Sequence, residues 1–491
     1  MTRQPPAEDR RGPDPGDGMQ PRVTVHEAAV KLDGPLLFVR RTLDVGLNEA
    51  VEVLDRSGAP RLGRVAALDT ELVTIELLAP SAGLGLADTV VRFLGAPIEF
   101  GVGPGLLGRV FDGVGNVIDG GPPIAVRKRL RVDGLPLNPV ARATPRAFIE
   151  TGITTVDLMN SLVRGQKLPI FSGGGLPHDR IAVQIAGHAR LLAQAGAARA
   201  PEGFAIVFCG IGVPYTTAEY FRRALEGSGA LERSALFLNL ASDSSTQRLL
   251  TPRFALTAAE YLAFEEGKHV LAILTDLTNY CEALREVAGA KGEVPGRKGF
   301  PGYMYSDLAT LYERAGCVHG EAGETTGSLT QLPILTMPND DIGHPIPDLS
   351  GYITEGQIVL SRELDRAGVY PPVSVLPSLS RLMKDGTGEG YTHPDHPALA
   401  SQLYAAYARA TQARLLASVV GEEGLADSDR HYLALGTAFE QQLVHQGDAR
   451  TLAQSMEVGW RLLRGLPRSE LGRLSDAQIE AHLAGGEFVG V

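Results

Sequence analysis

The segment from Lys167 to Arg180, KLPIFSGGGLPHDR, has the layout of a phosphate-binding loop. A short apolar run predicts a buried strand, three glycines follow it, and a helix is predicted after Pro177. The apolar residues at helical spacing in that helix are Ile181, Ile185, Leu191 and Leu192. In such a loop, backbone N–H groups and the N-terminus of the helix bind phosphate oxygens. The layout therefore indicates nucleotide chemistry.

The side chains that a working phosphate loop needs are replaced in this segment. In the pattern GxxxxGK[ST], the two glycines, the lysine and the hydroxyl residue would fall on Ser172, Pro177, His178 and Asp179. Lysine supplies a permanent cation and the hydroxyl binds Mg²⁺, whereas histidine is mostly neutral near pH 7. Proline also lacks a backbone N–H, and a carboxylate at this position competes with a phosphate for the helix dipole. We interpret these residues, with Gly173, Gly174 and Gly175, as a degenerate nucleotide site, and an arbitrary glycine-rich turn is the alternative from this segment alone.

One acidic residue is a candidate for metal binding, and none is predicted to act as a general base. Asp276 ends the apolar run LAILTD, as a Mg²⁺-coordinating aspartate does in nucleotide hydrolases, although it could equally cap the helix that follows. After the predicted strand FAIVFC, the first acid is Glu219, which falls inside a predicted helix. A hydrolytic water would therefore lack a nearby general base on this edge.

Arg381 lies between apolar neighbours in the run VLPSLSRLMKDG, at the junction to the last part of the chain. It is either a solvated surface residue or an arginine finger, a permanently charged donor that bridges γ-phosphate oxygens in a neighbouring subunit. Lys384 is a weaker candidate in the same loop.

The loop EVPGRKGFPGY is made rigid by Pro295 and Pro301 and carries Arg297 and Lys298. It is either a plain surface loop or a bearing against a partner.

Histidines and cysteines give no metal site in this sequence. His393 and His396 are two possible ligands, but a third and a fourth partner are missing, so we predict no metal. The three cysteines, Cys209, Cys281 and Cys317, are odd in number and contain no CxxC pair. Neither a disulfide framework nor a zinc site follows, and a reducing cytoplasm fits best.

Composition excludes two classes of partner. The chain has 491 residues with a net charge of −11, which is opposite to what a phosphate-backbone binder needs, so we expect no nucleic acid. No apolar run approaches the ~20 residues that span a bilayer, so any membrane association is expected to be indirect.

The sequence predicts a multidomain α/β protein in four parts. Residues 1–21 read as a disordered tail, and residues 22–95 as a small closed β-barrel of alternating runs. Residues 96–376 begin with a Gly- and Pro-rich connector, and then buried apolar runs alternate with helices, which predicts a mostly parallel sheet. Residues 377–491 should form a helical domain, because strand signals stop after Pro377. The predicted helices are Ala218–Glu226, Leu256–Glu266, Asn279–Val287, Ser401–Val420, one begun by Asp427 or Ser428, Leu452–Arg464, and one opened by the capping box SDAQ at Ser475.

Longer motifs carry a resemblance to a known family. They include FIETGITTVDLMNSLVRGQKLPIFSGGGLPH, TPRFALTAAEYLAFEEGKHVLAILTDLTNYCEALRE, PGYMYSDLATLYERAG, ILTMPNDDIGHPIPDLSGYITEGQIVLSREL and YPPVSVLPSLSRLMKDG. From about Val23 to Gly465 the chain resembles the non-catalytic B subunit (beta chain) of V-type and archaeal-type rotary ATPases. Departures occur at Cys317–Ser328, which is longer and acidic instead of basic, at Lys291-Gly292-Glu293, and at Cys209–Pro214.

The resemblance implies a β-barrel, a RecA-like P-loop-NTPase-type domain with a degenerate phosphate loop, and a helical domain. It implies a ring in which three copies of this chain alternate with three catalytic A subunits around a central shaft, with peripheral stalk subunits as further partners. The ring would lie on the cytoplasmic side of a membrane across which protons or Na⁺ move. No intrinsic cofactor is expected, and Mg-ATP or ADP should bind at the interface with the A subunit. Arg381 would be the finger inserted into that site, and the loop with Pro295, Gly296, Arg297, Phe300 and Pro301 would face the shaft. The alternative is a self-sufficient hexameric ATPase of the same superfamily, an export ATPase or a helicase, which would require a functional P-loop.

Overall fold

A computed structural model describes residues 24–27, 29–42, 44–56, 58, 60–134, 137, 139–192, 203–319 and 325–483. The chain divides into two compact units, Met1–Ile98 and Glu99–Val491. The tail expected over residues 1–21 lies outside the described residues.

The first unit is a seven-stranded antiparallel sheet with the order β1-β7-β4-β5-β6-β3-β2. Val51, Val53, Val65 and Ile75 are fully buried and form the centre of its core, because alternate residues along a strand face the same side. The predicted strand-rich region is confirmed. No pairing between the edge strands β1 and β2 closes the sheet in the described part of the chain, so the closed barrel is not established. The strands are β1 (Thr24–Glu27), β2 (Ala29–Asp33), β3 (Leu36–Arg40), β4 (Glu49–Leu54), β5 (Pro60–Leu68), β6 (Leu72–Leu77) and β7 (Val90–Pro97).

The second unit is built on a ten-stranded sheet whose main path has the order β22-β21-β14-β20-β18-β16-β17-β9 and is parallel except at the β21–β22 edge. Two short strands extend this sheet by antiparallel pairing, β19 with β20 and β11 with β19. The continuous apolar runs form its inner strands because both faces of a parallel sheet are covered. Its strands are β9 (Arg109–Asp112), β14 (Ile170–Gly173), β16 (Phe204–Val213), β17 (Ser234–Leu240), β18 (His269–Thr275), β20 (Thr325–Met337), β21 (Gly356–Leu360) and β22 (Val373–Ser380). The two short strands of this sheet are β11 (Arg142–Ala143) and β19 (Gly316–His319). Separate small sheets are formed by β8 (Glu99–Val102) with β10 (Lys128–Arg131), and by β12 (Phe148–Glu150) with β13 (Leu162–Val163) and β15 (Arg190–Leu191).

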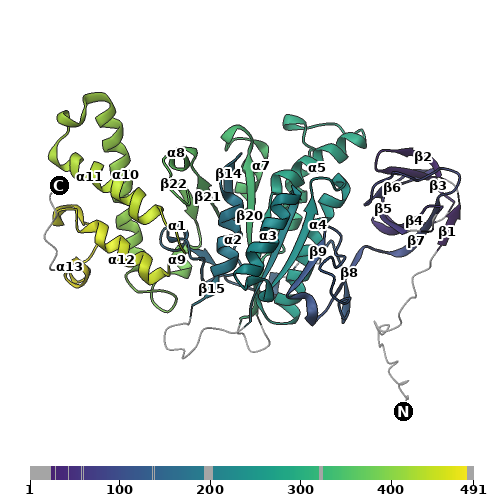
Figure 1. Cartoon of the computed structure of the whole chain (residues 1–491), viewed down its shortest axis with the longest axis horizontal. Helices are drawn as coiled ribbons and strands as arrows, with labels where there is room; N and C mark the ends of the chain where they lie inside the picture. Colours follow the sequence, from purple (N-terminus) through teal and green to yellow (C-terminus); the bar gives the residue numbers. More distant parts are fainter. Residues whose placement is uncertain are drawn as a thin grey trace, which may run out of the picture. The chain divides into compact units, whose positions relative to one another are not determined.

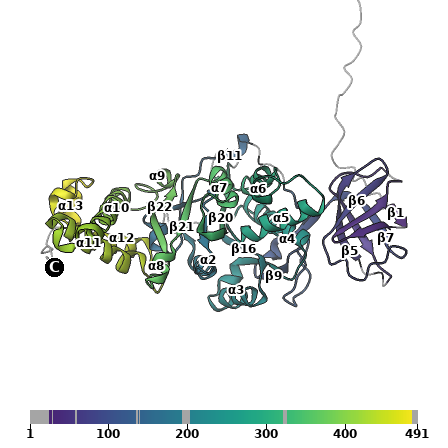
Figure 2. The same ribbon diagram turned by 90° about the horizontal axis from the view of Figure 1, so that it is seen from above.

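Helices cover both faces of this sheet, with α3 on one side and α5 and α6 on the other (Figure 2). The helices of this part are α1 (Thr154–Asp157), α2 (His178–His188), α3 (Tyr215–Gly227), α4 (Ser245–Glu260), α5 (Leu277–Ala290), α6 (Met304–Tyr312), α7 (Pro345–Ile353), α8 (Arg362–Arg366) and α9 (Met383–Gly386). The predicted mostly parallel sheet with interleaved helices is therefore confirmed.

The C-terminal part is helical, as predicted (Figure 1). Its helices are α10 (His396–Val420), α11 (Asp427–Ala438), α12 (Leu452–Leu463) and α13 (Asp476–Leu483). The capping box expected at Ser475 forms, because the Gln478 N–H donates to Ser475 Oγ and the Ser475 N–H donates to Gln478 Oε1. The buried face of α10 includes Leu399 and Leu403, which join the core cluster of this region.

Several element boundaries differ from the sequence prediction, and three of the differences have a clear physical reason. Helix α2 ends at His188, and Leu191 instead pairs with Ile149 of β12, so its apolar side chain is buried by a strand contact. Helix α4 begins at Ser245, whose preceding residue Ser244 caps it, well before the expected start at Leu256. Strand β22 continues to Ser380, past the expected stop at Pro377, because it pairs with β21 and is itself the edge strand of the sheet, where the missing N–H of a proline is tolerated.

Candidate functional site

The glycine loop lies between β14 and α2, at the carboxyl end of the parallel sheet, as the sequence predicts. Ligands of such sheets bind at this edge. Strand β14 pairs with β20 on one side and β21 on the other, which fixes the start of the loop. Gly175 has φ +81°, a conformation that favours glycine. The sequence thus folds locally into the strand, loop and helix of a phosphate-binding segment.

Inside the loop, the polar side chains contact one another. Ser172 Oγ and His178 Nδ1 lie 2.9 Å apart, and Ser172 is fully buried. His178 Nε2 lies 3.7 Å from Asp179 Oδ1. Burial raises the pKa of Asp179 above its ordinary value; the nearby His178 lowers it and the nearby Asp276 raises it. The positions of the missing lysine and hydroxyl are therefore held by a histidine and a carboxyl group that interact with each other.

A second carboxylate, which no sequence motif predicted, lies against the loop. The oxygen Asp340 Oδ1 lies so close to Gly173 that a Cβ atom there would be 2.1 Å away from it. Arg362 Nε donates to Asp340 Oδ2 at 2.7 Å, and Arg362 Nη2 donates to Asp340 Oδ1 and to the carbonyl of Gly174, both at 2.9 Å. The hydrogen bond from Arg362 holds the pKa of the Asp340 carboxyl below its ordinary value. An ion pair thus covers the start of the glycine loop.

Asp276 caps the helix that follows it, which was one of its two sequence interpretations. Its Oδ1 accepts from the N–H of Thr278 at 2.8 Å and from the N–H of Thr336 at 3.2 Å. Asp276 is largely buried and follows the carboxyl end of β18. This carboxylate is therefore already held by two backbone donors.

Glu219 offers no base to the loop. It lies in α3, and its carboxylate accepts hydrogen bonds from Arg222 at 2.7 and 2.9 Å and from Arg223 at 2.6 Å. These hydrogen bonds, from Arg222 and then Arg223, lower the pKa of Glu219 to about 2. Such a weakly basic carboxylate is poorly matched to proton abstraction near pH 7.

Together these residues do not fit a catalytic Mg-nucleotide. Three carboxylates, those of Asp179, Asp276 and Asp340, gather at the loop, and a polyphosphate would be repelled by their charge. The guanidinium that touches the loop, on Arg362, is already paired with Asp340. The loop has the backbone of a phosphate site without the side-chain chemistry.

Arg381 lies in a different setting, just after the end of β22. Its backbone N–H donates to the carbonyl of Glu355 at 2.9 Å, and its Nη1 donates to the carbonyl of Thr354 at 3.4 Å. The exposed side chain lines a cavity of about 510 Å³ together with Lys384, on α9, and Arg473. None of the described residues that line this cavity is acidic, and none of its three cations forms an ion pair within the described part of the chain. Arg473 was not predicted, since no motif surrounds it in the sequence.

The loop around residues 295–301 is closed on itself. Pro295 and Pro301 form a bridge, and the Gly296 N–H donates to the carbonyl of Phe300 at 2.8 Å. Arg297 donates to Asp348 at 3.2 Å and to the carbonyl of Gly343 at 3.0 Å. The Phe300 side chain is buried, so it anchors the loop and does not itself present a surface to a partner.

Metal-binding geometry is not found at the histidines. Both ring nitrogens of His396 are engaged, Nε2 with the carbonyl of Leu158 at 3.0 Å and Nδ1 with Thr392 Oγ1 at 3.1 Å. No group of three His, Cys, Asp or Glu residues suited to a metal ion is present among the described residues. The three cysteines are buried free thiols. None of the described helices is both long and apolar enough to cross a bilayer.

Comparison with known proteins bears directly on this arrangement. Residues 152–380 match the ATP synthase alpha/beta family nucleotide-binding domain, and residues 385–483 match the C-terminal domain of V and A type ATP synthase. The structure is similar to that of the ATP synthase subunit NeqB from Nanoarcheaum equitans, with a TM-score of 0.68 and 33% sequence identity. The match covers 88% of this chain and 100% of NeqB. The chain therefore belongs to the V/A-type ATP synthase family, as a B-type subunit.

Proposed function

We propose that this chain is a non-catalytic subunit of a V/A-type rotary ATP synthase or ATPase. The observation that carries the proposal is the glycine loop, where His178 and Asp179 replace the lysine and the hydroxyl, and Asp340 lies against Gly173. A phosphoryl-transfer site needs an unpaired cation for the transferred phosphate and a ligand for Mg²⁺. The loop provides neither, so we infer a regulatory and structural role.

The chain acts on ATP through Arg381, which it contributes to the nucleotide site of a neighbouring catalytic A subunit. A finger must be charged, accessible and free to pair with phosphate oxygens. Arg381 is exposed, has no carboxylate partner in the described part of the chain, and shares its cavity with Lys384. Leu379 and Tyr404, which line the same cavity, are 48% and 44% exposed, as expected for residues that a partner covers. Mg-ATP or ADP would be bound mainly by the A subunit, with these cations completing the site.

The remaining parts of the complex follow from this role. A ring of alternating A and B subunits would surround a central shaft, and the loop at residues 295–301 would face that shaft. Its hydrogen-bonded, ion-paired construction suits a bearing, and the neighbouring Val294 is 89% exposed. Peripheral stalk subunits and a membrane sector would couple ATP turnover to proton or Na⁺ movement. The chain would then lie in the cytoplasm, joined to the membrane through the other subunits.

A self-sufficient hexameric ATPase, such as an export ATPase or a helicase, is not favoured. It would need its own loop lysine and Mg²⁺ ligand, and the same residues oppose it. Turnover by the purified chain without any partner distinguishes the two functions. We expect steady-state hydrolysis of Mg-ATP to be indistinguishable from buffer, whereas turnover near the ~1–100 s⁻¹ of working phosphoryl-transfer enzymes would refute the proposal.

A further inference from the structure

A small cavity lies apart from both the glycine loop and the Arg381 site. Its volume is about 380 Å³, and its polar lining consists of Thr144, Arg146, Arg164, Cys317, His319 and Tyr391. None of the described lining residues is Asp or Glu. Two arginines thus share a cavity that lacks a lining carboxylate, in a chain whose net charge is −11.

The backbone around the cavity is built by a close approach of strands. Strand β11 pairs with β19, which places Ala143 opposite Cys317. Gly165 has φ +83°, and a Cβ atom there would lie 2.6 Å from Cys317 Sγ, so only glycine permits this approach. The Cys317 thiol donates to the carbonyl of Arg164 at 3.3 Å. Arg164 is therefore held at the wall of the cavity by its neighbours.

The guanidinium of Arg164 is only partly satisfied by protein groups. Its Nη1 donates to His269 Nε2 at 2.9 Å, and His269 Nδ1 lies 2.9 Å from Ser328 Oγ. Burial, and then the charge of Arg164, lowers the pKa of His269 to about 4, so the imidazole is a neutral acceptor near pH 7. Arg164 forms no ion pair within the described residues, and burial lowers its own pKa. A half-buried cation of this kind is stabilised by an anion.

We propose that this cavity binds a phosphate-class oxyanion, either the free ion or a phosphate monoester. Planar guanidinium groups donate paired hydrogen bonds to tetrahedral oxyanions, and Arg146 and Arg164 supply two of them. The hydroxyl groups of Thr144 and Tyr391 add donors suited to the remaining oxygens. The volume exceeds that of a phosphate ion alone, which leaves room for a small ester group. The inference does not depend on the role proposed for Arg381.

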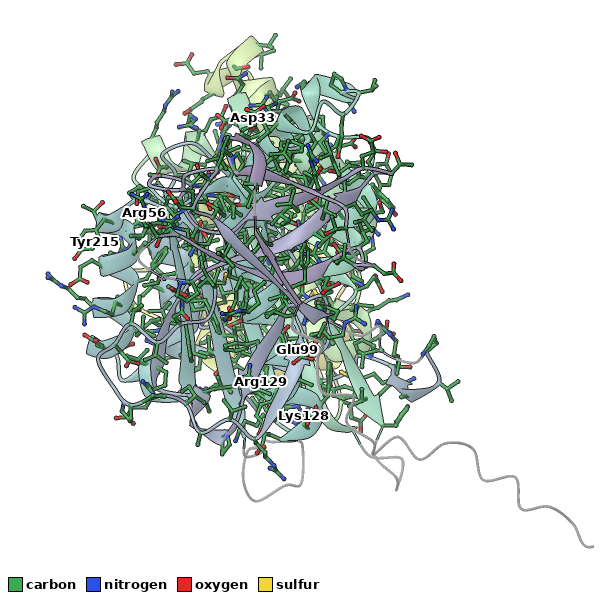
Figure 3. All side chains as sticks on the ribbon, turned by 90° about the vertical axis from the view of Figure 1, so that its right-hand side faces the viewer. Asp33, Arg56, Glu99, Lys128, Arg129 and Tyr215 are labelled. Carbon is green, nitrogen blue, oxygen red and sulfur yellow. The ribbon has the colours of Figure 1, made fainter. Side chains whose placement is uncertain are left out.

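Calorimetric titration of the full chain with inorganic phosphate, at constant ionic strength, tests the proposal. We expect one saturable site, which Arg164→Gln weakens at least about tenfold, since it removes a charge-assisted hydrogen-bonding group. Arg146→Gln should weaken it by a smaller factor, and this variant keeps the test valid if Arg164→Gln fails to fold. The matched control is Arg129→Gln on β10, an exposed position outside the cavity lining (Figure 3), which should leave the affinity within about twofold.

A parallel titration with glycerol 3-phosphate shows whether the cavity prefers a phosphate monoester or the free ion. Binding of either one that depends on Arg164 supports the site. Absence of phosphate binding by the wild-type chain, or binding that all three variants retain, would overturn the proposal. The sequence also places Glu321 and Glu324 shortly after His319. If only the Glu321→Gln, Glu324→Gln variant bound phosphate, the arginines would serve the chain's own carboxylates, and the proposal would equally be overturned.

Discussion

The glycine loop and the Arg381 cavity differ in how their charges are used. At the loop, Arg362 pairs with Asp340, and Asp179 and Asp276 add further negative charge. At the cavity, Arg381 and Lys384 have no acidic neighbour among the described lining residues. The loop pairs its guanidinium internally and keeps an excess of carboxylates, whereas the cavity leaves its cations available. The glycine loop has the backbone layout of a nucleotide site, but this contrast in charge supports the proposal that the Arg381 cavity is the region that contacts a nucleotide.

The largest effect should come from removing the available cation. In a reconstituted ring with the catalytic subunit, Arg381→Ala should lower ATP turnover at least several-hundred-fold, because a finger supplied in trans contributes about 10³–10⁵ in rate. Arg381→Lys should restore little, since the planar donor fork is lost. Turnover would be measured on rings whose assembly is checked by gel filtration.

The control for this prediction is Lys384→Ala, in the same cavity. We expect a smaller loss, because a flexible point charge is less suited to two phosphate oxygens than a guanidinium. An assembled Arg381→Ala ring with nearly full turnover would remove Arg381 from the mechanism and, with it, the contrast between the two regions.

The next effect concerns the ion pair over the glycine loop. Gly173→Ala should destabilise the chain by about 1–3 kcal/mol in chemical unfolding, because its Cβ would overlap Asp340 Oδ1. Gly174→Ala is the matched control: nothing lies within 4 Å of its Cβ position, so the change should stay within about 0.5 kcal/mol. Adding Asp340→Ala to Gly173→Ala should recover much of the loss. Equal stabilities of the two glycine variants would show that Asp340 does not lie on the loop.

A smaller effect should appear in the pH dependence of stability, because a buried histidine, His396, begins a helix that lines the Arg381 cavity. Burial lowers the pKa of His396 from 6.5 to about 4, and this residue begins α10, whose Pro397 and Tyr404 line the cavity. Because the folded pKa is the lower one, the unfolded chain binds the proton first as the pH falls. The contribution of neutral His396 is therefore fully present above pH 6.5 and is lost toward pH 4.

Between pH 7 and pH 5 this loss amounts to about 1–2 kcal/mol for one such histidine. Urea unfolding at the two pH values should show a smaller pH-dependent loss for His396→Gln than for the wild-type chain. His431→Gln, at an exposed position of α11, should leave the pH dependence unchanged. An unaltered pH dependence in His396→Gln would mean that the imidazole is not held neutral by burial.

The smallest effect is expected from partial repair of the loop. His178→Lys combined with Asp179→Thr should produce no measurable hydrolysis, because Ser172, Pro177 and Asp340 remain and no base is supplied. Affinity for Mg-ATP should rise modestly, since a cation is gained and a carboxylate is lost. Calorimetry measures that affinity, and unchanged or weaker binding would mean that the loop has been aligned wrongly with GxxxxGK[ST].

Local patterns were enough to predict the elements around the loop. The apolar run before the glycines forms β14, and α2 follows Pro177, because strand and helix periodicity are properties of neighbouring residues. The same patterns failed where a tertiary contact decides the structure. Leu191 continues the helical spacing of α2, yet it is held in β15 by pairing with β12.

The ion pair on the loop could not be predicted for a similar reason. Asp340 and Arg362 are separated by 22 positions, and they meet because β20 and β21 lie on either side of β14. Asp340 has φ +55°, a conformation that is uncommon for residues other than glycine. An aspartate in a polar stretch of sequence does not predict this backbone conformation. Arg473 and Arg381 line the same cavity although 92 positions separate them, because the C-terminal region packs against the end of β22. Charged residues that pair only in the folded chain follow no periodic pattern in the sequence, so sequence periodicity cannot predict such pairs.

The most direct test of the central claim is ATP turnover by the assembled ring when the partner's loop lysine is replaced. We predict that the chain alone shows no turnover, that turnover begins when a catalytic subunit with an intact GxxxxGK[ST] is added, and that replacing that lysine in the partner abolishes it. Hydrolysis by the chain alone, or turnover that survives loss of the partner's lysine, would contradict the account, because the chain's own loop would then be catalytic.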